Sequence, residues 1–442
     1  MGGKQALRQL LSTTDEGLVT TPRPDLAPLV NWKQSATLPI HRWLRYREGF
    51  SPQLIEALGL GARILDPFCG SGSLLVGAAE QERIATGIEL NPLAAFTTRV
   101  KLRPLSESEL GSVLAFQQQL EAFATRTERW PLPALRIYDK VFEPEILDTI
   151  LRLRQAAEAH DDREAVRGFL LLAWLAILEP VGSYFKEGNG IKYRKRKRLK
   201  GGYTLREDGE WQLARFGASQ CAFVVQSLRQ QLADMLCDSA RWSSGTWRNQ
   251  CVMEGDSRSI ASTLDPQSFD SILFSPPYAN RFDYFESQKV ELWFGGFVDT
   301  YEDMHSLRKR SVRSHLGADL IENGCGGLGQ IEDLISLLDR DSYAVRMRVP
   351  SLIRGYFADM LNILTSCRQL LRPGGSCHIV VGNSAYGGVI IPSDSLIAIL
   401  GRRAGFKRAS VEPIRHLTVA PQQRIALNGL EHYMRESVVT LS

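Results

Sequence analysis

The segment from Asp66 to Ser73, with the sequence DPFCGSGS, constrains the fold of this chain more than any other. It directly follows the short apolar run RILD (63–66) and precedes the helical sequence LLVGAAEQ. Glycines at positions 70 and 72 allow a sharp turn and a close approach of the backbone to a ligand, and the next helix directs its N–H groups toward that ligand. The sequence therefore predicts a strand, a ligand-binding turn and a helix in succession.

Other short apolar runs have the character of buried parallel strands, because each ends at polar residues and is followed by a turn or a helix start. They are residues 84–90, 269–275, 378–383 and 436–441. Helical periodicity covers 141–180, 214–237 and 351–371, and the Pro373-Gly374-Gly375 segment stops the last of these helices. Alternating strands and helices predict an α/β fold with a parallel sheet, helices on both faces and ligands at the carboxyl ends of the strands.

Length and composition exclude several classes of protein. With 442 residues, 44% hydrophobic and 23% charged, the chain is neither disordered nor a small disulfide-stapled protein. The longest apolar run, Phe169 to Leu178, is about half as long as the roughly 20 residues of a membrane span. The N-terminal sequence lacks the apolar core of a secretion signal, so we expect a cytoplasmic protein without a membrane contact. Seven cysteines without a CxxC pair argue against disulfides and a zinc site, and we predict no metal.

Glu89 strengthens the significance of the glycine-rich turn. It stands at the end of the next predicted strand, 17 residues after Gly72, where a carboxylate can accept two hydrogen bonds from a ribose diol. These residues predict a site for a nucleoside cofactor, and the absence of a GxxxxGK[ST] motif disfavours a P-loop. The alternative is an ordinary strand-turn-helix unit whose glycines serve packing.

The sequence DPFCGSGS resembles the cofactor-binding motif of amino-group DNA methyltransferases that use S-adenosylmethionine. The resemblance implies a Rossmann-like class I methyltransferase fold, in which the turn lines the methionine end of the cofactor and Glu89 holds its ribose. The implied cofactor-binding residues of the turn are Asp66, Pro67, Phe68, Gly70, Ser71 and Gly72. The segment from Phe50 to Leu54 is similar to the motif that closes over the cofactor carboxylate, with a plain Ser-Pro helix start as its alternative.

The segment Ser275-Pro276-Pro277-Tyr278 follows the strand FDSILF, at the sheet edge where chemistry is expected. Two prolines hold the backbone extended and remove two N–H donors, which leaves carbonyl oxygens free to accept hydrogen bonds. An exocyclic amine is a poor nucleophile until acceptors engage its protons. Ser275 Oγ and the Pro276 carbonyl suit that role, and Tyr278 offers a flat face for stacking a base. The alternative is a proline-rich turn with a core tyrosine.

The family resemblance also bears on the target base. Its members with Ser at the first position of this tetrapeptide are often cytosine-N4 enzymes, so Ser275 favours cytosine N4 first and adenine N6 second. Methylation at cytosine carbon 5 is disfavoured, because it needs a thiolate and no cysteine here follows a proline. Transfer would be one direct in-line displacement from sulfonium to nitrogen, accelerated largely by positioning.

Two further positions are candidates for the site. Asp256 lies 19 residues before Ser275, where the family places a contact to the cofactor adenine; a helix cap is its alternative. Phe282, Tyr284 and Phe285 are candidates to wall a flipped base, and we expect core packing for two of the three.

The resemblance covers roughly 40–105 and 250–442, and with an antiparallel pair at the C-terminus it implies a mostly parallel sheet of seven strands. We therefore predict three parts. Residues 1–105 carry the cofactor motif, 106–250 form a mostly helical insertion with a basic loop, and 251–442 carry the SPPY motif with an insertion at 297–350. The long separation of the two motifs leaves the site of sequence recognition open.

Two basic segments lie in the predicted insertions and suit the phosphates of nucleic acid, although such runs are often only solvated faces. The residues expected to contact nucleic acid are Lys192, Arg194, Lys195, Arg196, Lys197, Arg198, Lys200, Arg308, Arg310 and Arg313. We therefore predict a site-specific methyltransferase that acts on double-stranded DNA and flips its target base. A cognate restriction or defence-system component would be a further partner. The alternatives are an RNA or tRNA base methyltransferase, a protein glutamine methyltransferase and a catalytically inactive DNA-binding scaffold.

Overall fold

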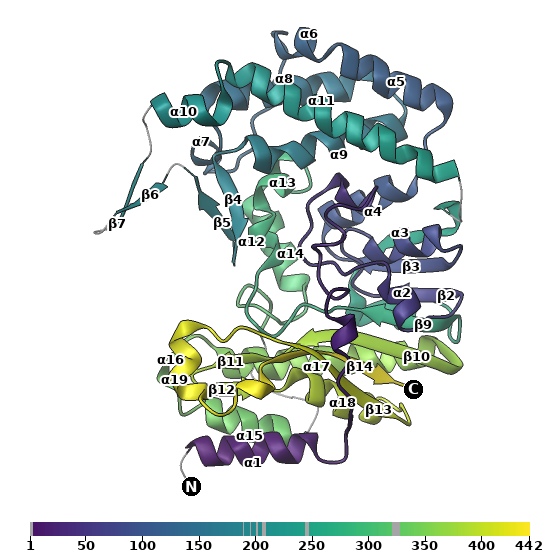
Figure 1. The fold of residues 1–442 in the computed structure, drawn as a ribbon, viewed down its shortest axis with the longest axis vertical. Helices are drawn as coiled ribbons and strands as arrows, with labels where there is room; N and C mark the ends of the chain where they lie inside the picture. Colours follow the sequence, from purple (N-terminus) through teal and green to yellow (C-terminus); the bar gives the residue numbers. More distant parts are fainter. Residues whose placement is uncertain are drawn as a thin grey trace.

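The computed structural model describes residues 3–188, 190–194, 196–199, 202–205, 209–243, 247–320 and 328–442. Its main sheet has eight strands in the order β1-β13-β14-β10-β9-β2-β3-β8 (Figure 1). The strands are β1 (Val19–Thr20), β2 (Arg63–Asp66), β3 (Ile84–Glu89), β8 (Cys251–Glu254), β9 (Phe269–Phe274), β10 (Leu371–Gly382), β13 (Ala409–His416) and β14 (Arg435–Leu441). The architecture is the predicted α/β fold, and it is consistent with a Rossmann-like methyltransferase.

The sheet is mostly parallel. Strand β2 pairs in parallel with β3 and β9, β3 with β8, and β9 with β10. Strand β14 runs antiparallel to both β10 and β13, as the C-terminal strand pair predicted. The seven predicted strands are joined by an eighth, β1, whose two residues pair with the edge of β13. This pairing continues through hydrogen bonds from the N–H groups of Thr21 and Arg23 to β13, so the N-terminal segment covers an edge that would otherwise be open.

Helices cover both faces of the sheet because successive side chains of a buried strand point to opposite sides. In β2, Ile64 belongs to the hydrophobic core on one face and Leu65 to the core on the other. In β9, Leu273 and Ile272 divide in the same way. The first face is covered by α3 (Ser73–Glu80) and α4 (Pro92–Leu102), and the second by α17 (Val349–Leu370) and α18 (Ser393–Arg403).

The long helix α17 shows how local sequence determines an element. Pro350 stands in its first turn, where its missing N–H costs no hydrogen bond. The helix ends at Leu370, just before the Arg372-Pro373-Gly374-Gly375 segment, as its sequence predicted. Strand β10 then carries the chain back through the sheet toward the edge where β9 ends.

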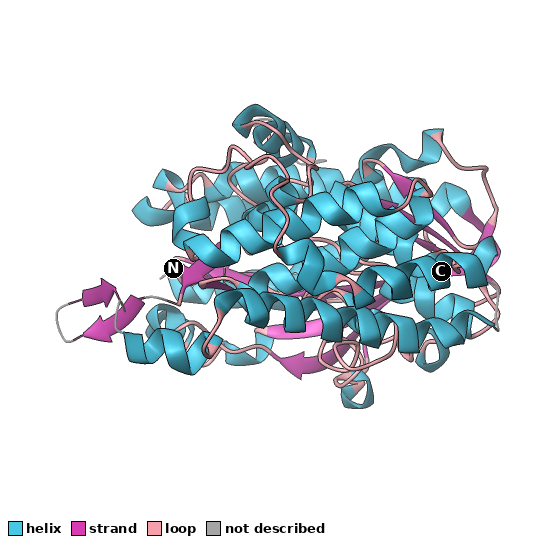
Figure 2. Ribbon diagram, turned by 90° about the horizontal axis from the view of Figure 1, so that it is seen from above, coloured by secondary structure: helices cyan, strands magenta, loops and turns pink. Residues whose placement is uncertain are grey.

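A mostly helical region lies beyond the sheet, at the top of Figure 1, and Figure 2 shows it from above. Its helices are α5 (Glu107–Gln118), α6 (Leu120–Ala124), α7 (Tyr138–Val141), α8 (Pro144–His160), α9 (Glu164–Val181), α10 (Gly209–Phe216) and α11 (Gln220–Asp238). Helix α9 is central, because it packs against α8, α11 and α4. The region also contains two hairpins, β4 (Tyr184–Glu187) with β5 (Gly190–Tyr193), and β6 (Arg196–Leu199) with β7 (Gly202–Leu205).

The remaining α-helices and strands have at most 13 residues each. They are α1 (Gly3–Asp15), α2 (Leu54–Ala57), α12 (Tyr284–Ser287), α13 (Lys289–Phe294), α14 (Tyr301–Arg310), α15 (Gly329–Leu338), α16 (Ser342–Arg346), β11 (Ser384–Tyr386), β12 (Val389–Ile391) and α19 (Arg424–Leu427). Within the described ranges, no helix combines the length and the apolar character that crossing a membrane requires.

Candidate active site

A cavity of about 470 Å³ lies at the carboxyl ends of β2, β3 and β9. Both sequence motifs line it, although they are far apart in the chain. Its predicted residues are Asp66, Phe68 and Gly70 from the glycine-rich turn, Glu89 from β3, Asp256, and Ser275, Pro276, Pro277 and Tyr278 from the segment after β9. The carboxyl edge of a parallel sheet is where α/β proteins bind their ligands, because the strands all end there.

The glycine-rich turn is shaped by its two glycines. Gly70 and Gly72 have φ angles of 52° and 82°, which favour a residue without Cβ. A Cβ on Gly70 would lie 2.8 Å from a ring carbon of Tyr46, and one on Gly72 would lie 2.7 Å from Thr98. Alanine at either position would therefore displace a neighbouring side chain as well as strain the backbone.

Three predicted residues of the same turn do not line the cavity in the described structure: Pro67, Ser71 and Gly72. Buried side chains hold the backbone of two of them through hydrogen bonds. The buried Lys101 donates hydrogen bonds to the carbonyl oxygens of Ser71 and His41, at 3.1 and 3.2 Å. The hydroxyl of Ser257 donates to the carbonyl of Pro67. These contacts fix the backbone of the turn at Ser71 and Pro67.

Two carboxyl groups lie beside the turn. Oε2 of Glu89 accepts a hydrogen bond from the Gly70 N–H and Oε1 one from the Asn91 N–H, both at 2.8 Å. Asp66 Oδ1 accepts from the Phe68 N–H at 2.9 Å. Burial raises the pKa of Glu89 to about 7 and that of Asp66 to about 8. Within the described residues neither carboxyl group has an ion-pair partner, so the pair suits a ligand that carries positive charge.

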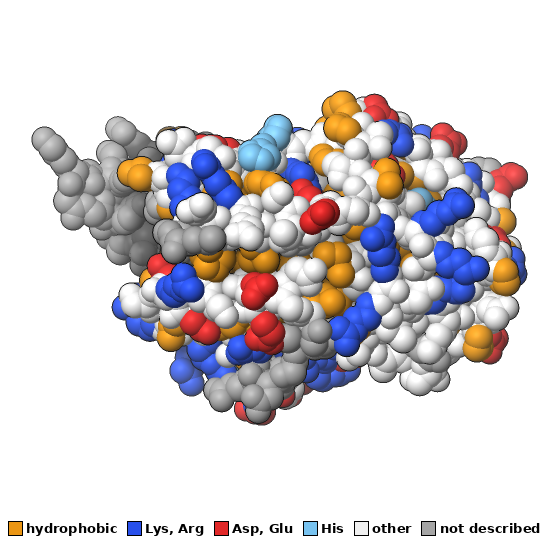
Figure 3. All heavy atoms as spheres, turned by 90° about the horizontal axis from the view of Figure 1, so that it is seen from below, with side chains coloured by type: hydrophobic (Ala, Val, Ile, Leu, Met, Phe, Trp, Pro, Cys, Tyr) orange, Lys and Arg blue, Asp and Glu red, His pale blue; other side chains and the backbone are white. Residues whose placement is uncertain are grey.

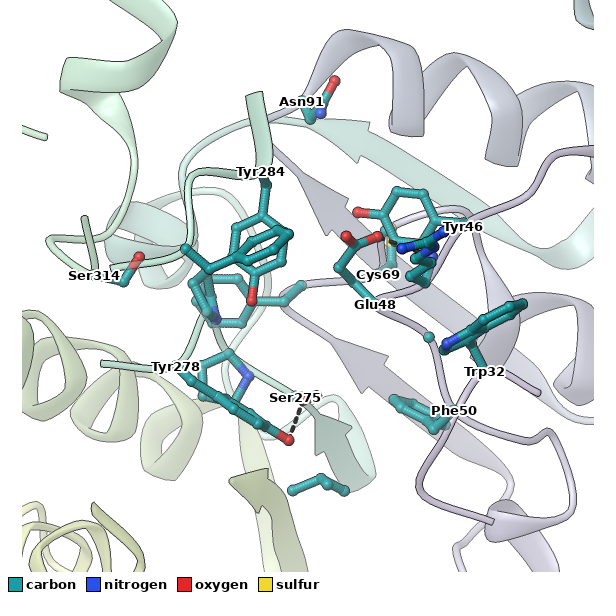
Figure 4. A pocket seen from close by; sticks show the side chains of 18 of the residues that line it. Trp32, Tyr46, Glu48, Phe50, Cys69, Asn91, Ser275, Tyr278, Tyr284 and Ser314 are labelled. Atoms are coloured by element: carbon teal, nitrogen blue, oxygen red, sulfur yellow. Dashed lines mark hydrogen bonds between the residues drawn. The ribbon is translucent and has the colours of Figure 1, made fainter. Parts of the chain in front are cut away.

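The SPPY segment takes part in a chain of hydrogen bonds. Ser275 Oγ donates to the Tyr278 hydroxyl at 3.4 Å, which Figure 4 marks with a dashed line. The Tyr278 hydroxyl donates to Glu436 Oε1 at 2.9 Å, and Arg415 Nε donates to Glu436 Oε2 at 2.6 Å. Burial, together with the charge of Glu436, raises the pKa of Tyr278 well above its usual value, so this phenol stays protonated.

The ring of Tyr278 rests against the backbone of β10. A Cβ on Gly382 would lie 2.9 Å from a ring carbon of Tyr278, so the ring needs the glycine. The turn that follows is held by hydrogen bonds from the hydroxyls of Ser384 and Tyr386 to the carbonyl of Ala279, at 2.7 and 2.8 Å. The position of Tyr278 is therefore determined both at its ring face and at its hydroxyl.

Several cavity residues were not predicted from the sequence. Arg415 and Glu436 come from β13 and β14, while Tyr46 and Glu48 come from the N-terminal segment. Figure 4 shows Glu48 and Tyr46 across the cavity from Ser275 and Tyr278. Glu436 stands at the start of the apolar run ESVVTL, and this position was a local signal in the sequence. The structure buries Glu436, and charged residues are seldom buried without a partner.

The three aromatic residues after the SPPY segment all line the cavity. Phe285 is buried in the hydrophobic core, whereas Phe282 and Tyr284 are half-buried, with their ring centroids 4.7 Å apart and their planes inclined by 60°. One of the three, and not the expected two, therefore packs into the core.

Asp256 has the geometry of a helix cap. Its side chain accepts from the Arg258 N–H at 2.9 Å and forms a two-pronged ion pair with the Arg258 guanidinium, at 3.0 and 2.6 Å. It also lines the cavity, so the cap does not remove it from the site. Its contact to a cofactor adenine stays a prediction.

The basic segment from Lys192 to Lys200 is described only in part. Lys195 and Lys200 lie outside the described residues, and for Arg196, Lys197 and Arg198 the structure describes only the backbone of β6. Lys192 is exposed on β5. Arg194 turns back, and its Nε donates to the carbonyl of Tyr184 at 2.7 Å. The structure thus leaves the DNA contact of this segment as a prediction.

The second basic segment is divided by the fold. Arg308 pairs with Asp283 at 2.6 Å and Arg313 pairs with Asp359 at 3.0 Å, so both guanidinium groups support the protein itself. Arg310 is exposed at the end of α14. On the face seen from below in Figure 3, basic and acidic side chains are interspersed over the described surface, unlike the single-sign surface that attracts a polyanion.

The fold is a Rossmann-like α/β fold consistent with a methyltransferase, and its cavity lies at the carboxyl edge of the sheet. No protein-family model matches the chain. The chain is 25% identical to the Type II methyltransferase M.AvaI of Nostoc sp. (strain PCC 7120 / SAG 25.82 / UTEX 2576) over 404 residues, which cover 86% of this chain and 81% of that protein. It is 24% identical to the Type II methyltransferase M.BsoBI of Geobacillus stearothermophilus over 438 residues, 91% of this chain and 85% of that protein. These similarities support a methyltransferase.

Proposed function

We propose that this protein is a site-specific DNA methyltransferase that transfers a methyl group from S-adenosylmethionine to the exocyclic amine of a flipped base. The observation that carries the proposal is the shared cavity, which both the glycine-rich turn and the SPPY segment line. The similarity to Type II methyltransferases over most of the chain supports it independently. A cognate restriction or defence-system component is the proposed partner.

The residues around the glycine-rich turn fit the proposed cofactor. S-adenosylmethionine carries a sulfonium and an ammonium group, and the carboxyls of the buried Asp66 and the half-buried Glu89 lie in the cavity without an ion-pair partner among the described residues. Glu89 has lone pairs left for a ribose diol after its two backbone hydrogen bonds. Phe68 and Gly70 line the same end of the cavity. When bound, the sulfonium supplies an electrophilic methyl group.

The residues of the SPPY segment would hold and orient the amine. Ser275 Oγ and the carbonyl of Pro276 are acceptors for its protons, which concentrates the nitrogen lone pair for attack. Tyr278, with its ring fixed by Gly382, provides the face on which the base stacks. The target must leave the duplex to enter the cavity, and a well-oriented amine then gains most of its acceleration from positioning.

Cytosine N4 is the first proposed target, since Ser275 stands at the first position of the tetrapeptide. Adenine N6 is the second, because a hydroxyl and a backbone carbonyl can accept from the amine of either base. An RNA base amine is the remaining candidate in this fold, and the resemblance to Type II methyltransferases favours DNA over it.

Sequencing of DNA from cells that express the protein tests the proposal, provided that the detection separates N4-methylcytosine from N6-methyladenine. We expect N4-methylcytosine at one short recognition sequence, and none in cells that express the Ser275→Ala, Tyr278→Ala double variant. Genomic DNA without either modified base in the wild-type strain would contradict the proposal, and N6-methyladenine alone would reassign the target base.

A further inference from the structure

We propose that Glu436, ion-paired with Arg415, acts through the Tyr278 hydroxyl to make Ser275 an effective hydrogen-bond acceptor and to take up the proton that the target amine loses. This inference rests on the proposed function. It assigns roles to two residues of the last antiparallel strand pair that neither motif contains. Glu436 would be a positioning residue, since it acts on the amine through Tyr278 and Ser275.

The hydrogen-bonded chain from Ser275 through Tyr278 and Glu436 to Arg415 removes an obstacle to the use of Ser275 as an acceptor. An exocyclic amine needs acceptors for its protons, yet a neutral hydroxyl is a weaker acceptor than a carboxylate and carries a proton of its own. That proton must point away from the amine. The structure provides its destination, because Ser275 Oγ donates to the Tyr278 hydroxyl at 3.4 Å.

Arg415, at the far end of this hydrogen-bonded chain, determines the direction of each hydrogen bond in it. Arg415 can only donate, and a carboxylate ion-paired with it can only accept, so the 2.9 Å bond between Glu436 Oε1 and the Tyr278 hydroxyl uses the phenol's proton. The phenol oxygen is then free to accept the Ser275 proton. The lone pairs of Ser275 Oγ are left for the amine, and they are polarised by a negative charge two bonds further along the chain.

The same chain gives a balanced route for the proton. The nitrogen lone pair forms the new C–N bond, the electron pair of the broken S–C bond stays on sulfur, and the methylated nitrogen must lose one proton. It passes to Ser275 Oγ as the Ser275 proton moves to Tyr278 and the Tyr278 proton moves to Glu436. Glu436 is then a neutral carboxyl group. It releases the proton to water beside the partly exposed Arg415.

The sheet fixes the geometry of this chain. Arg415 and Glu436 are cross-strand neighbours in the β13–β14 register, and Gly382 is the neighbour of Glu436 in the β10–β14 register. Gly382 is also the residue against which the Tyr278 ring rests. Three adjacent strands therefore hold the carboxylate, its counter-ion and the ring face in one place, and the Glu436 side chain is almost fully buried at 5% exposure.

The Tyr278→Phe variant provides the sharpest test, because it removes only one oxygen. The ring, its stacking face and the Glu436–Arg415 pair all remain, so the variant should fold as the wild type does. We expect the single-turnover rate of methyl transfer to fall by about 100-fold, in the range of a lost proton-transfer partner. The dissociation constants for S-adenosylmethionine and for DNA, measured by calorimetry and fluorescence anisotropy, should stay within about 2-fold. A Tyr278→Phe variant with the wild-type rate would overturn the inference.

A double-mutant analysis shows whether Tyr278 and Glu436 act in one hydrogen-bonded chain or contribute to the rate independently. We expect Glu436→Gln to lower the rate about as much as Tyr278→Phe does, and the double variant to be no slower than either single variant. Multiplied losses in the double variant would overturn the chain. Glu121→Gln is the matched control, since it disrupts the exposed 2.6 Å pair with Arg229 in the helical region and should leave the rate unchanged.

The wild-type protein distinguishes the two proposals. Methyl transfer by the wild type with no loss of rate in Tyr278→Phe would overturn the proton chain and leave the proposed function intact. A wild type that binds S-adenosylmethionine and transfers no methyl group to DNA would overturn the proposed function and, with it, this inference.

Discussion

The backbone N–H of Gly70 donates a hydrogen bond of 2.8 Å to Oε2 of Glu89. The glycine-rich turn after β2 and the carboxyl end of β3 are therefore one unit, in which the glycine both shapes the turn and orients the carboxylate. The second oxygen of Glu89 is held by the Asn91 N–H, so both its position and its direction are determined by backbone groups.

The Glu89→Ala variant should bind S-adenosylmethionine at least about 10-fold more weakly, because hydrogen bonds to a charged group contribute about 1.5–3 kcal/mol each. Isothermal titration calorimetry measures the change. Glu254→Ala is a close control, since Glu254 is the register neighbour of Glu89 on β8 but is half-exposed and pairs with Arg99. An unchanged dissociation constant in Glu89→Ala would remove that residue from the binding site.

Cofactor affinity should also depend on pH. Burial holds the pKa of Glu89 at about 7 and that of Asp66 at about 8, so the free protein binds protons that a cationic ligand must displace. Affinity should therefore rise as pH increases through these values and level off above them, since both carboxyls are then already ionised. Calorimetry at several pH values checks this, and Glu89→Gln should remove part of the rise. A pH-independent difference between wild type and Glu89→Gln would contradict the assignment.

The Tyr278→Ala variant should lose methyl transfer far more than cofactor binding. Its ring is the proposed stacking face and lies outside the glycine-rich turn, so the loss should appear in the single-turnover rate, by about 100-fold or more if stacking contributes about 1–3 kcal/mol and the proton chain is lost as well. Calorimetric titration with S-adenosylmethionine provides the comparison. Equal losses in rate and in cofactor affinity would exclude the stacking role.

Neutralising the basic residues from Lys192 to Lys200 should weaken DNA binding and flatten its dependence on salt. Each phosphate contact that is lost lowers the slope of log affinity against log salt by about 0.9. Fluorescence anisotropy over a range of salt concentrations measures this slope. Neutralising Arg308 and Arg313 instead should lower thermal stability, because both are ion-paired within the protein. An unaltered slope in the first variant would show that the run does not contact phosphates.

The Asp394→Ala variant should unfold more readily. The Asp394 side chain is fully buried and accepts hydrogen bonds from Arg435 at 2.7 Å, Ser437 at 2.8 Å and Asn383 at 2.9 Å. Its removal leaves a mostly buried guanidinium without its main partner, which costs about 3–5 kcal/mol. Urea unfolding measures the change. Asp25→Ala, which breaks an exposed ion pair, is the control and should have no measurable effect. A similar midpoint for both variants would refute this role.

Local sequence was sufficient for much of the fold. Strands such as 63–66 and 269–274 were predictable because their apolar runs are short and bounded, and α17 because its periodicity ends at a Pro-Gly-Gly segment. The two-residue strand β1 was not predictable, since it exists only through pairing with the edge of β13. For Asp256, the helix-cap alternative is confirmed, and its pair with Arg258 follows from a spacing of two residues.

What the sequence determined by itself is the pair of motifs and the strands that precede them, because turn chemistry and strand periodicity are properties of neighbouring residues. Only the tertiary structure decided which residues from distant parts of the sequence contact those motifs. Glu436 lies 158 positions from Tyr278, and Lys101 lies 30 positions from Ser71. Both contacts depend on strand order, register and helix packing, which bring residues together across the fold and which the order of the amino acids does not display locally.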